Sequence, residues 1–224
     1  MKIGTKSVLY GAHCFFLHPW FVAAAWWKLY GFPWDPRLWV SFFVHDLRYI
    51  GKPNMDGEEG ELHPFLGARI MGWLFDTHLW KSIWFANTVG RMLDKAFGEA
   101  PPGTIAPGTT LTWYCFSLYH SRFLAKKYGS NPTRLCVADK LALCLTPRWL
   151  YLPMVRATGE IREYRKLAAE GKYASMKTAR AGDREWFDAM VAYLRRWVDE
   201  HKDGKLDTWT PGGREAKDET GVWR

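Results

Sequence analysis

The sequence has few of the features that mark several common classes of protein. It contains only four cysteines in 224 residues and no CxxC pair, which argues against a disulfide framework and against a thiolate zinc site. It also has no strand-like alternation of apolar and polar residues, no internal repeat and no glycine-rich phosphate loop. We therefore predict an all-α fold, and we interpret the cysteines as reduced core residues (Cys14, Cys115, Cys136 and Cys144).

The amino terminus lacks a convincing export signal. Two lysines precede an apolar run over residues 8–27, which superficially resembles a signal peptide. Three residues that are rare in an export segment or a spanning helix interrupt the run, namely His13, His18 and Pro19. We therefore predict a cytoplasmic protein without a membrane partner.

Aromatic residues and positive charge are abundant. The chain has 14 Trp, 48% hydrophobic residues and a formal charge of +8 at pH 7, so it has ample surface to bury and attracts anions such as phosphates. The aromatics fall mostly in apolar stretches and do not alternate with Lys and Arg, which disfavours a stacking surface for nucleic acid. We expect a small phosphorylated partner, and we leave the oligomeric state open.

The chain is long enough for one well-buried domain with extensions. We predict a helical core over residues 1–153, a helical extension packed on it over 154–202, and a flexible tail over 203–224. Apolar patterning, caps and breakers predict helices over residues 20–30, 36–49, 63–75, 76–95, 110–128, 131–146, 158–170 and 184–201.

Several histidines and aspartates on these predicted helices suit a divalent metal: His18, the adjacent pair His45 and Asp46, His63, His120 and Asp139. Imidazole and carboxylate ligands without thiolate fit Fe, Mn, Zn, Co or Mg. Consecutive side chains on a helix diverge by about 100°, so the adjacent pair reaches one cation only if that cation lies off the helix end. Taken singly, each of these histidines is more often a core or surface residue than a ligand.

The combination resembles the HD superfamily of metal-dependent phosphohydrolases. The segment 42–52 (FFVHDLRYIGK) resembles its hydrophobic-HD-hydrophobic-Gly-Lys signature, and the family's other ligands are matched in order by His18, by the HPFLGA run at His63, by Tyr119-His120 and by Val137-Ala138-Asp139-Lys140. His18 stands 27 residues before His45, a usual separation for the family. The long Trp-rich segment between His63 and His120 departs from the pattern.

The resemblance implies an HD-domain helical bundle with extra C-terminal helices and one or two divalent ions. By resemblance, His18, His45, Asp46 and Asp139 hold the first metal, while His63 and His120 hold a second with Asp46 bridging, or act on a phosphate in a one-metal enzyme. Asp46, His63 and His120 would then be catalytic.

The activity implied by the resemblance is hydrolysis of a phosphate ester or anhydride of a nucleotide: a deoxynucleotide, a dinucleoside polyphosphate or a cyclic nucleotide. The chain is similar to small HD nucleotide hydrolases and to phage-encoded HD proteins. Some HD relatives use the same six ligands as di-iron oxygenases on a small polyol or phosphonate, which is one alternative. A non-catalytic binder of a nucleotide or nucleic acid is another.

Five basic residues lie near these ligands in sequence and are candidates to bind phosphate: Lys140, Lys52, Arg122, Lys126 and Arg69. Lys140 is the preferred one because it adjoins Asp139. His13 competes with His18 as the first ligand, but it lacks the Val-Ala that follows His18, so His18 is favoured. His78 and His201 match no motif and are interpreted as structural.

Overall fold

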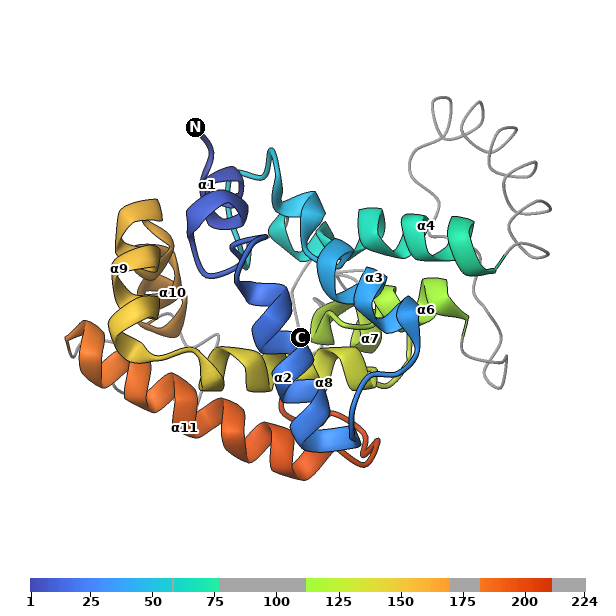
Figure 1. Cartoon of the computed structure of the whole chain (residues 1–224). Helices are drawn as coiled ribbons and strands as arrows, with labels where there is room; N and C mark the ends of the chain where they lie inside the picture. The colour runs from blue at the N-terminus through green and yellow to red at the C-terminus, as the bar shows by residue number, and fades with distance from the viewer. Residues whose placement is uncertain (58, 77–111, 170–181, 211–224) are drawn as a thin grey trace, which may run out of the picture.

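The computed structural model describes residues 1–57, 59–76, 112–169 and 182–210 (Figure 1). Its helices are α1 (Ile3–Tyr10), α2 (His18–Tyr30), α3 (Pro36–Val44), α4 (Pro64–Phe75), α6 (Trp113–Leu118), α7 (Arg122–Lys127), α8 (Arg134–Leu145), α9 (Arg148–Thr158), α10 (Glu160–Ala169) and α11 (Asp183–His201), with short 3₁₀ turns η1 (Leu47–Tyr49) and η2 (Gly60–Leu62). The described residues contain no strand, and the all-α prediction is confirmed.

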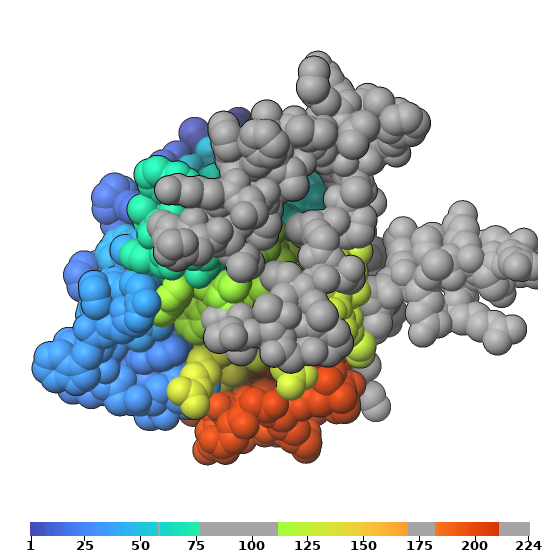
Figure 2. Space-filling view, turned by 90° about the vertical axis from the view of Figure 1, so that its right-hand side faces the viewer, coloured from blue at the N-terminus to red at the C-terminus, as the bar shows by residue number. Residues whose placement is uncertain are grey.

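The described helices pack in layers around α2 and α8. These two helices lie side by side through the centre, α11 runs beneath them, and α4 and α6 form the opposite side (Figure 1). Figure 2 shows α11, in red, along the lower edge of the adjacent face. Fully buried side chains such as Phe42, Leu135 and Trp197 fill the interior, and burial of each such side chain contributes about 1.5–3 kcal/mol. The small residues Ala23 and Ala25 are buried in α2.

Two predicted helices prove to be interrupted, and both breaks lie at candidate ligands. The helix predicted over 36–49 begins as expected, because Asp35 accepts a hydrogen bond from Arg37 N and Pro36 occupies the first turn, but α3 ends at Val44. The helix predicted over 110–128 is divided into α6 and α7, with His120 between them. At each break the backbone leaves the helical path, which allows the side chains of the candidate ligands at that point to face the interior.

Sequence patterning missed two helices. It gave α1 no helical assignment, and it treated Pro153 as the end of a segment, whereas α9 continues through this proline. Pro153 is exposed, so the carbonyl that loses its helical partner there can bond to water. The α11 helix begins at Asp183, directly after Gly182 and one residue before the predicted start.

Residues 203–210 were assigned to a flexible tail, but they pack on α7 and α11. Asp207 is buried and accepts hydrogen bonds from the Trp197 indole and from the backbone of Trp209 and Thr210. Because residues 203–210 are mostly polar, their composition gave no sign that Asp207 is buried. The rest of the tail and residues 77–95 of the helix predicted over 76–95, which include His78, lie outside the described residues. No described helix is both long enough and apolar enough to cross a membrane.

Candidate metal centre

The six predicted ligands come from separate parts of the helical core and meet in its interior. Each is at most 8% exposed. They form two groups, each able to hold a metal ion, and the groups share one carboxylate: the first comprises His18, His45, Asp46 and Asp139, and the second comprises Asp46, His63 and His120. A buried His/Asp cluster that suits a metal is therefore present.

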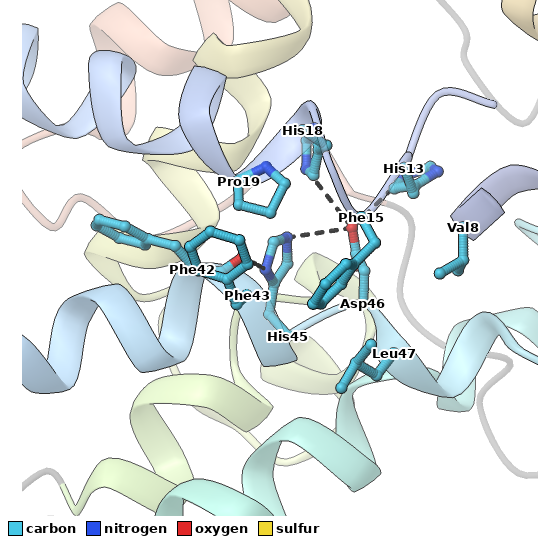
Figure 3. Close-up of a pocket in the computed structure, with 10 residues that line it drawn as sticks. All are labelled: Val8, His13, Phe15, His18, Pro19, Phe42, Phe43, His45, Asp46 and Leu47. Carbon is cyan, nitrogen blue, oxygen red and sulfur yellow. Dashed lines mark hydrogen bonds and ion pairs between the residues drawn. The ribbon is translucent and has the colours of Figure 1, made fainter. Parts of the chain in front are cut away.

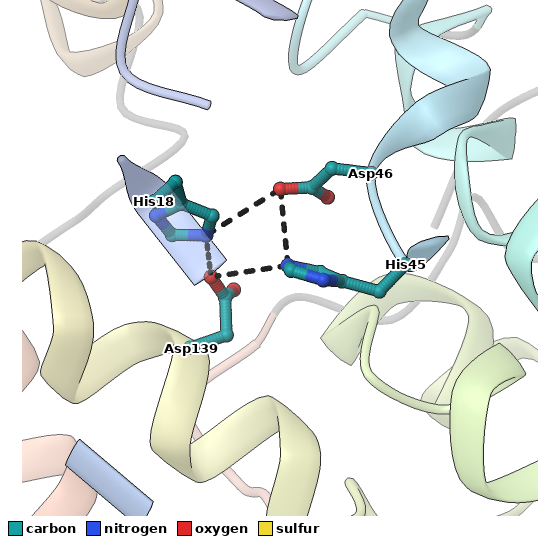
Figure 4. Close-up of side chains that lie close together, drawn as sticks. All are labelled: His18, His45, Asp46 and Asp139. Carbon is teal, nitrogen blue, oxygen red and sulfur yellow. Dashed lines mark hydrogen bonds and ion pairs between the residues drawn. The ribbon is translucent and has the colours of Figure 1, made fainter. Parts of the chain in front are cut away.

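The first group surrounds a common centre, as Figure 4 shows. His18 Nε2 lies 2.9 Å from Asp139 Oδ1 and 3.5 Å from Asp46 Oδ2. His45 Nε2 lies 3.1 Å from Asp46 Oδ2 and 3.8 Å from Asp139 Oδ1. Metal–ligand bonds of about 2.1 Å place neighbouring ligand atoms about 3.0–3.4 Å apart. The four side chains thus have spacings close to those around a single cation.

The second group uses the other oxygen of Asp46. Asp46 Oδ1 lies 3.6 Å from His63 Nε2 and 3.5 Å from His120 Nε2, and these two nitrogens are 3.0 Å apart. The carboxylate of Asp46 therefore faces one group with Oδ2 and the other with Oδ1. This is the placement that a bridging ligand between two ions requires.

Three of the imidazoles are oriented by their own backbone. The Nδ1 atoms of His45, His63 and His120 each lie 2.6–2.9 Å from the carbonyl oxygen three residues earlier. A carbonyl only accepts, so Nδ1 donates its proton, and the neutral form of each ring directs an Nε2 lone pair to the centre. Two Nε2 lone pairs 3.0 Å apart repel each other unless a proton or a cation lies between them, and this orientation suits metal ligation.

Two atoms at the centre have no hydrogen-bond partner within the described parts of the chain. His45 Nε2 and Asp46 Oδ2 are both buried without such a bond. A buried polar atom without a partner costs about 1–3 kcal/mol, and a cation bound by both atoms would remove that cost. The donor set of imidazole nitrogen and carboxylate oxygen fits a divalent metal.

The helix break explains how two consecutive residues serve one site. His45 caps α3, and Asp46 has φ −100° and ψ 0° before η1 begins. The expectation of a centre beyond the helix end is met. Gly67 in α4 lets that helix approach, because a Cβ there would lie 2.7 Å from Val44 O and 2.9 Å from His45 Cα.

Charge balance keeps both carboxylates ionised. Burial alone would raise the pKa of Asp46, but His45 and His13 beside it hold that pKa well below its usual range. Burial also opposes ionisation of Asp139, yet Lys140 and His18 lower its pKa well below the usual range. Lys140 Nζ bonds Asp139 Oδ2 at 2.7 Å and leaves Oδ1 facing His18.

The imidazoles differ in protonation. Burial lowers the pKa of His63 and of His120, and His120 adds to the effect on His63. Burial also opposes charge on His45, but Asp46 and Asp139 outweigh it and raise the pKa of His45 to about 10. In the metal-free protein a proton on His45 thus partly takes the place of a cation.

The other basic candidates occupy different surroundings. Arg122 donates to Thr210 and Tyr193 and pairs with Asp207, and Lys126 donates to the Thr210 carbonyl. Both side chains therefore bind the C-terminal segment. Of the remaining two, Arg69 is exposed on α4 and Lys52 is partly exposed after η1. Among the five basic residues, Lys140 is the one that forms a hydrogen bond and an ion pair with one of the six clustered side chains, that of Asp139.

The two histidines that compete for the first ligand position, His13 and His18, differ in their place relative to the cluster. His18 belongs to the first group, whereas His13 belongs to neither, although its Nε2 lies 4.0 Å from Asp46 Oδ2. His201 is held by Trp197, whose carbonyl lies 2.6 Å from His201 Nδ1, which agrees with a structural role. Sequence reasoning overlooked Tyr49, whose ring stacks on His63 at 4.0 Å. Its position three residues after Asp46 was the available signal.

No protein-family model matches the chain, and comparisons with curated proteins and with solved structures find no match. The likeness to HD proteins therefore depends on the residue pattern and on the geometry of this cluster.

Proposed function

We propose that the chain is an HD-type, metal-dependent phosphohydrolase that cleaves a phosphate ester or anhydride of a nucleotide. One observation carries the proposal: Asp46 presents one oxygen to His18 and His45 and the other to His63 and His120. Such a shared carboxylate is what the HD pattern implies for a site with one or two divalent ions. We assign His18, His45, Asp46 and Asp139 to the first ion.

The buried cluster suits phosphoryl chemistry. Divalent cations held by nitrogen and oxygen ligands lower the pKa of water and offset negative charge on phosphate. Within the chain, Lys140 holds Asp139, and backbone carbonyls hold three imidazoles, so the ligands are oriented before a substrate arrives. His63 and His120 would hold a second ion or contact a phosphate oxygen. The charge of +8 attracts a phosphorylated substrate.

A hydrolysis panel tests the proposal. The purified chain is loaded separately with Mn²⁺, Fe²⁺, Co²⁺, Zn²⁺ or Mg²⁺ and incubated with deoxynucleotides, dinucleoside polyphosphates and cyclic dinucleotides, and released phosphate and nucleotide are measured. We expect metal-dependent release that a chelator stops and that Asp46→Asn abolishes.

Asp188→Asn is the matched control, since Asp188 pairs with Arg148 at the exposed surface of α11. This variant makes the same chemical change away from the centre and should retain activity. Equal release by the wild type and by Asp46→Asn would show that the cluster is not the active site, and binding without release by any metal form would indicate a non-catalytic nucleotide binder.

A di-iron oxygenase is the second candidate, favoured by the same sharing of Asp46 between two ligand groups. A ligand set constrains the metal better than the reaction. Iron-loaded protein that consumes O₂ with a small polyol or phosphonate, and that releases no phosphate from nucleotides, would select this alternative.

A further inference from the structure

A cavity borders the cluster on the side of Asp46 Oδ2, and its wall includes a histidine outside both ligand groups (Figure 3). His13 lies between α1 and α2, and its Nε2 is 4.0 Å from Asp46 Oδ2. That oxygen also faces His18 and His45. His13 therefore adjoins the side of the first group that opens into a cavity.

We propose that His13 contacts the substrate, with Nε2–H donating a hydrogen bond to a phosphate oxygen beside Asp46, and that Glu160 positions it. The inference rests on the proposed function and adds to it a group that recognises phosphate. Glu160 lies in α10, beyond the residues that resemble HD proteins.

The distances favour a contact through a ligand. A separation of 4.0 Å is too long for a direct hydrogen bond between His13 Nε2 and Asp46. An oxygen of a bound phosphate that lies to the side of the line between these two atoms can accept from His13 Nε2 while it also approaches the cation site. The cavity is otherwise lined largely by apolar side chains, including Val8, Phe15 and Phe43, and a hydrogen bond is stronger in such surroundings than in water.

Ser7 contacts the imidazole of His13 on its Nδ1 side. Its Nδ1 lies 3.0 Å from Ser7 Oγ, and the same oxygen accepts from the His13 backbone at 3.4 Å. The proposed contact uses the tautomer in which the Ser7 hydroxyl donates to Nδ1 and the ring carries its proton on Nε2, toward the cavity. The centroid of the Tyr49 ring lies 4.8 Å from that of His13 and 4.0 Å from that of His63, so Tyr49 contacts both histidines and restricts their movement.

Glu160 fixes the loop that carries His13. Its side chain is fully buried, and Oε2 lies 3.9 Å from His13 Nδ1. Thr158 donates to Oε1 at 2.6 Å and Ala12 N at 3.4 Å, while the Tyr164 hydroxyl donates to Oε2 at 3.2 Å. This number of donors holds the carboxylate in one orientation against the loop.

Gly11 permits this close approach. A Cβ at Gly11 would lie 2.0 Å from Glu160 Oε1, which no real contact allows, so the loop and the carboxylate fit only because this residue has no side chain. The loop and helix α10 therefore fit each other closely, although Ala12 and Glu160 are 148 residues apart in the sequence.

Phosphate binding tests the role of His13 independently of turnover. Full-length protein loaded with Mn²⁺ is titrated with inorganic phosphate, and its metal content is measured in parallel. We expect His13→Leu to weaken phosphate binding about tenfold, the effect of one lost hydrogen bond, with metal content unchanged. His13→Gln, which keeps an N–H donor on a side chain of similar reach, should recover most of the affinity.

His201→Leu is the matched control. It removes a buried histidine that contacts Trp197 near the end of α11, away from the cavity, and should leave phosphate affinity intact. Loss of metal by His13→Leu would overturn the proposal by making His13 a ligand, and unchanged phosphate affinity would overturn it as well. Failure of the proposed function would look different, since phosphate would still bind while the nucleotide panel gave no release.

Glu160 is tested as a positioning residue by a double-mutant cycle. Glu160→Gln should weaken phosphate binding about threefold in the wild type and not at all in the His13→Leu background, because its effect passes through His13. Equal losses in both backgrounds would show a general structural role and would overturn the assignment to Glu160.

Discussion

Two buried groups of His and Asp side chains in this chain differ in how many hydrogen-bond donors the protein supplies to the carboxylate. Asp207, beside His201, accepts from the Trp197 indole, from two backbone amides and from the Thr210 hydroxyl, and it pairs with Arg122. Asp46 is equally buried but faces imidazole nitrogens, and its Oδ2 has no hydrogen bond among the described residues. The protein itself saturates one carboxylate and leaves the other open.

This difference separates a structural pair from a candidate metal site. Residue types alone do not distinguish the two groups, since each contains His and Asp in the interior. The distinguishing feature is convergence: three imidazoles of the cluster direct Nδ1 to their own backbone and Nε2 to one centre, whereas His201, which also directs Nδ1 to a backbone carbonyl, is a single imidazole beside a carboxylate that several donors surround. Lone pairs that point to one centre favour the binding of a cation, whereas a carboxylate that already accepts several hydrogen bonds requires no cation.

The largest effect is expected for Asp46→Asn. Asn replaces one of the two carboxylate oxygens with an NH₂ group, which cannot ligate a cation, and removes the negative charge that both groups share, so hydrolysis of the best substrate in the panel should fall by about 10³-fold or more. Initial rates at saturating metal measure it. Asp207→Asn should retain the wild-type rate per folded molecule, and a comparable loss in both variants would erase the distinction between the two groups.

Metal should stabilise the wild-type chain strongly. At a free metal concentration about 100 times the Kd, binding adds about 2.7 kcal/mol to the free energy of unfolding, which raises Tm by about 5–10 °C in a chain of this size. Thermal unfolding with and without Mn²⁺ or Fe²⁺ measures the shift. Asp207→Asn should show the full shift and Asp46→Asn little of it; an undiminished shift in Asp46→Asn would place the metal elsewhere.

Asp207→Asn should lower stability with metal absent. The substitution leaves Arg122 without its charged partner and weakens several hydrogen bonds to one carboxylate, for a loss of about 1–2 kcal/mol in the free energy of unfolding. Urea unfolding followed by Trp fluorescence measures it, with the exposed Asp188→Asn as reference. Wild-type stability in Asp207→Asn would contradict the structural role assigned to this carboxylate.

Metal affinity should rise with pH by about tenfold per unit between pH 6 and 8. The pKa of His45 is raised to about 10 by Asp46 and Asp139, so a metal must displace one proton throughout this range. Burial lowers the pKa of His63 and of His120, so these two rings add little to the proton release. Titrations in buffers of different ionisation enthalpy count the protons; an affinity that levels off above pH 7 would mean an ordinary pKa for His45.

Much of the candidate site was predictable because its residues are marked locally. The adjacent His45 and Asp46 in an apolar segment, together with three more histidines and Asp139 in the expected order, identified all six clustered side chains. The breaks after Val44 and around His120 were not predictable from apolar periodicity, because α3 and α6 keep helical patterning up to the point where tertiary contacts end them. Gly67 against His45 is one such contact.

The basic residues show where local reasoning fails. Arg122 and Lys126 follow His120 closely in sequence, yet both donate to Thr210, 88 and 84 residues away. Proximity along a helix says little about the direction of a long side chain. Glu160 was overlooked for the same reason, since its partner loop lies at the other end of the chain.

By itself the sequence determined the helical class and the identity of the six clustered side chains, because helical patterning and the HD-like spacing are encoded in local residue order. Only the tertiary structure decided which oxygen of Asp46 faces which histidines, that His18 and not His13 joins the cluster, and that α10 holds the loop beside it. These outcomes depend on packing between segments that are separated in sequence, by as much as 148 residues for Ala12 and Glu160, and a difference of about an ångström decides whether a side chain joins the cluster.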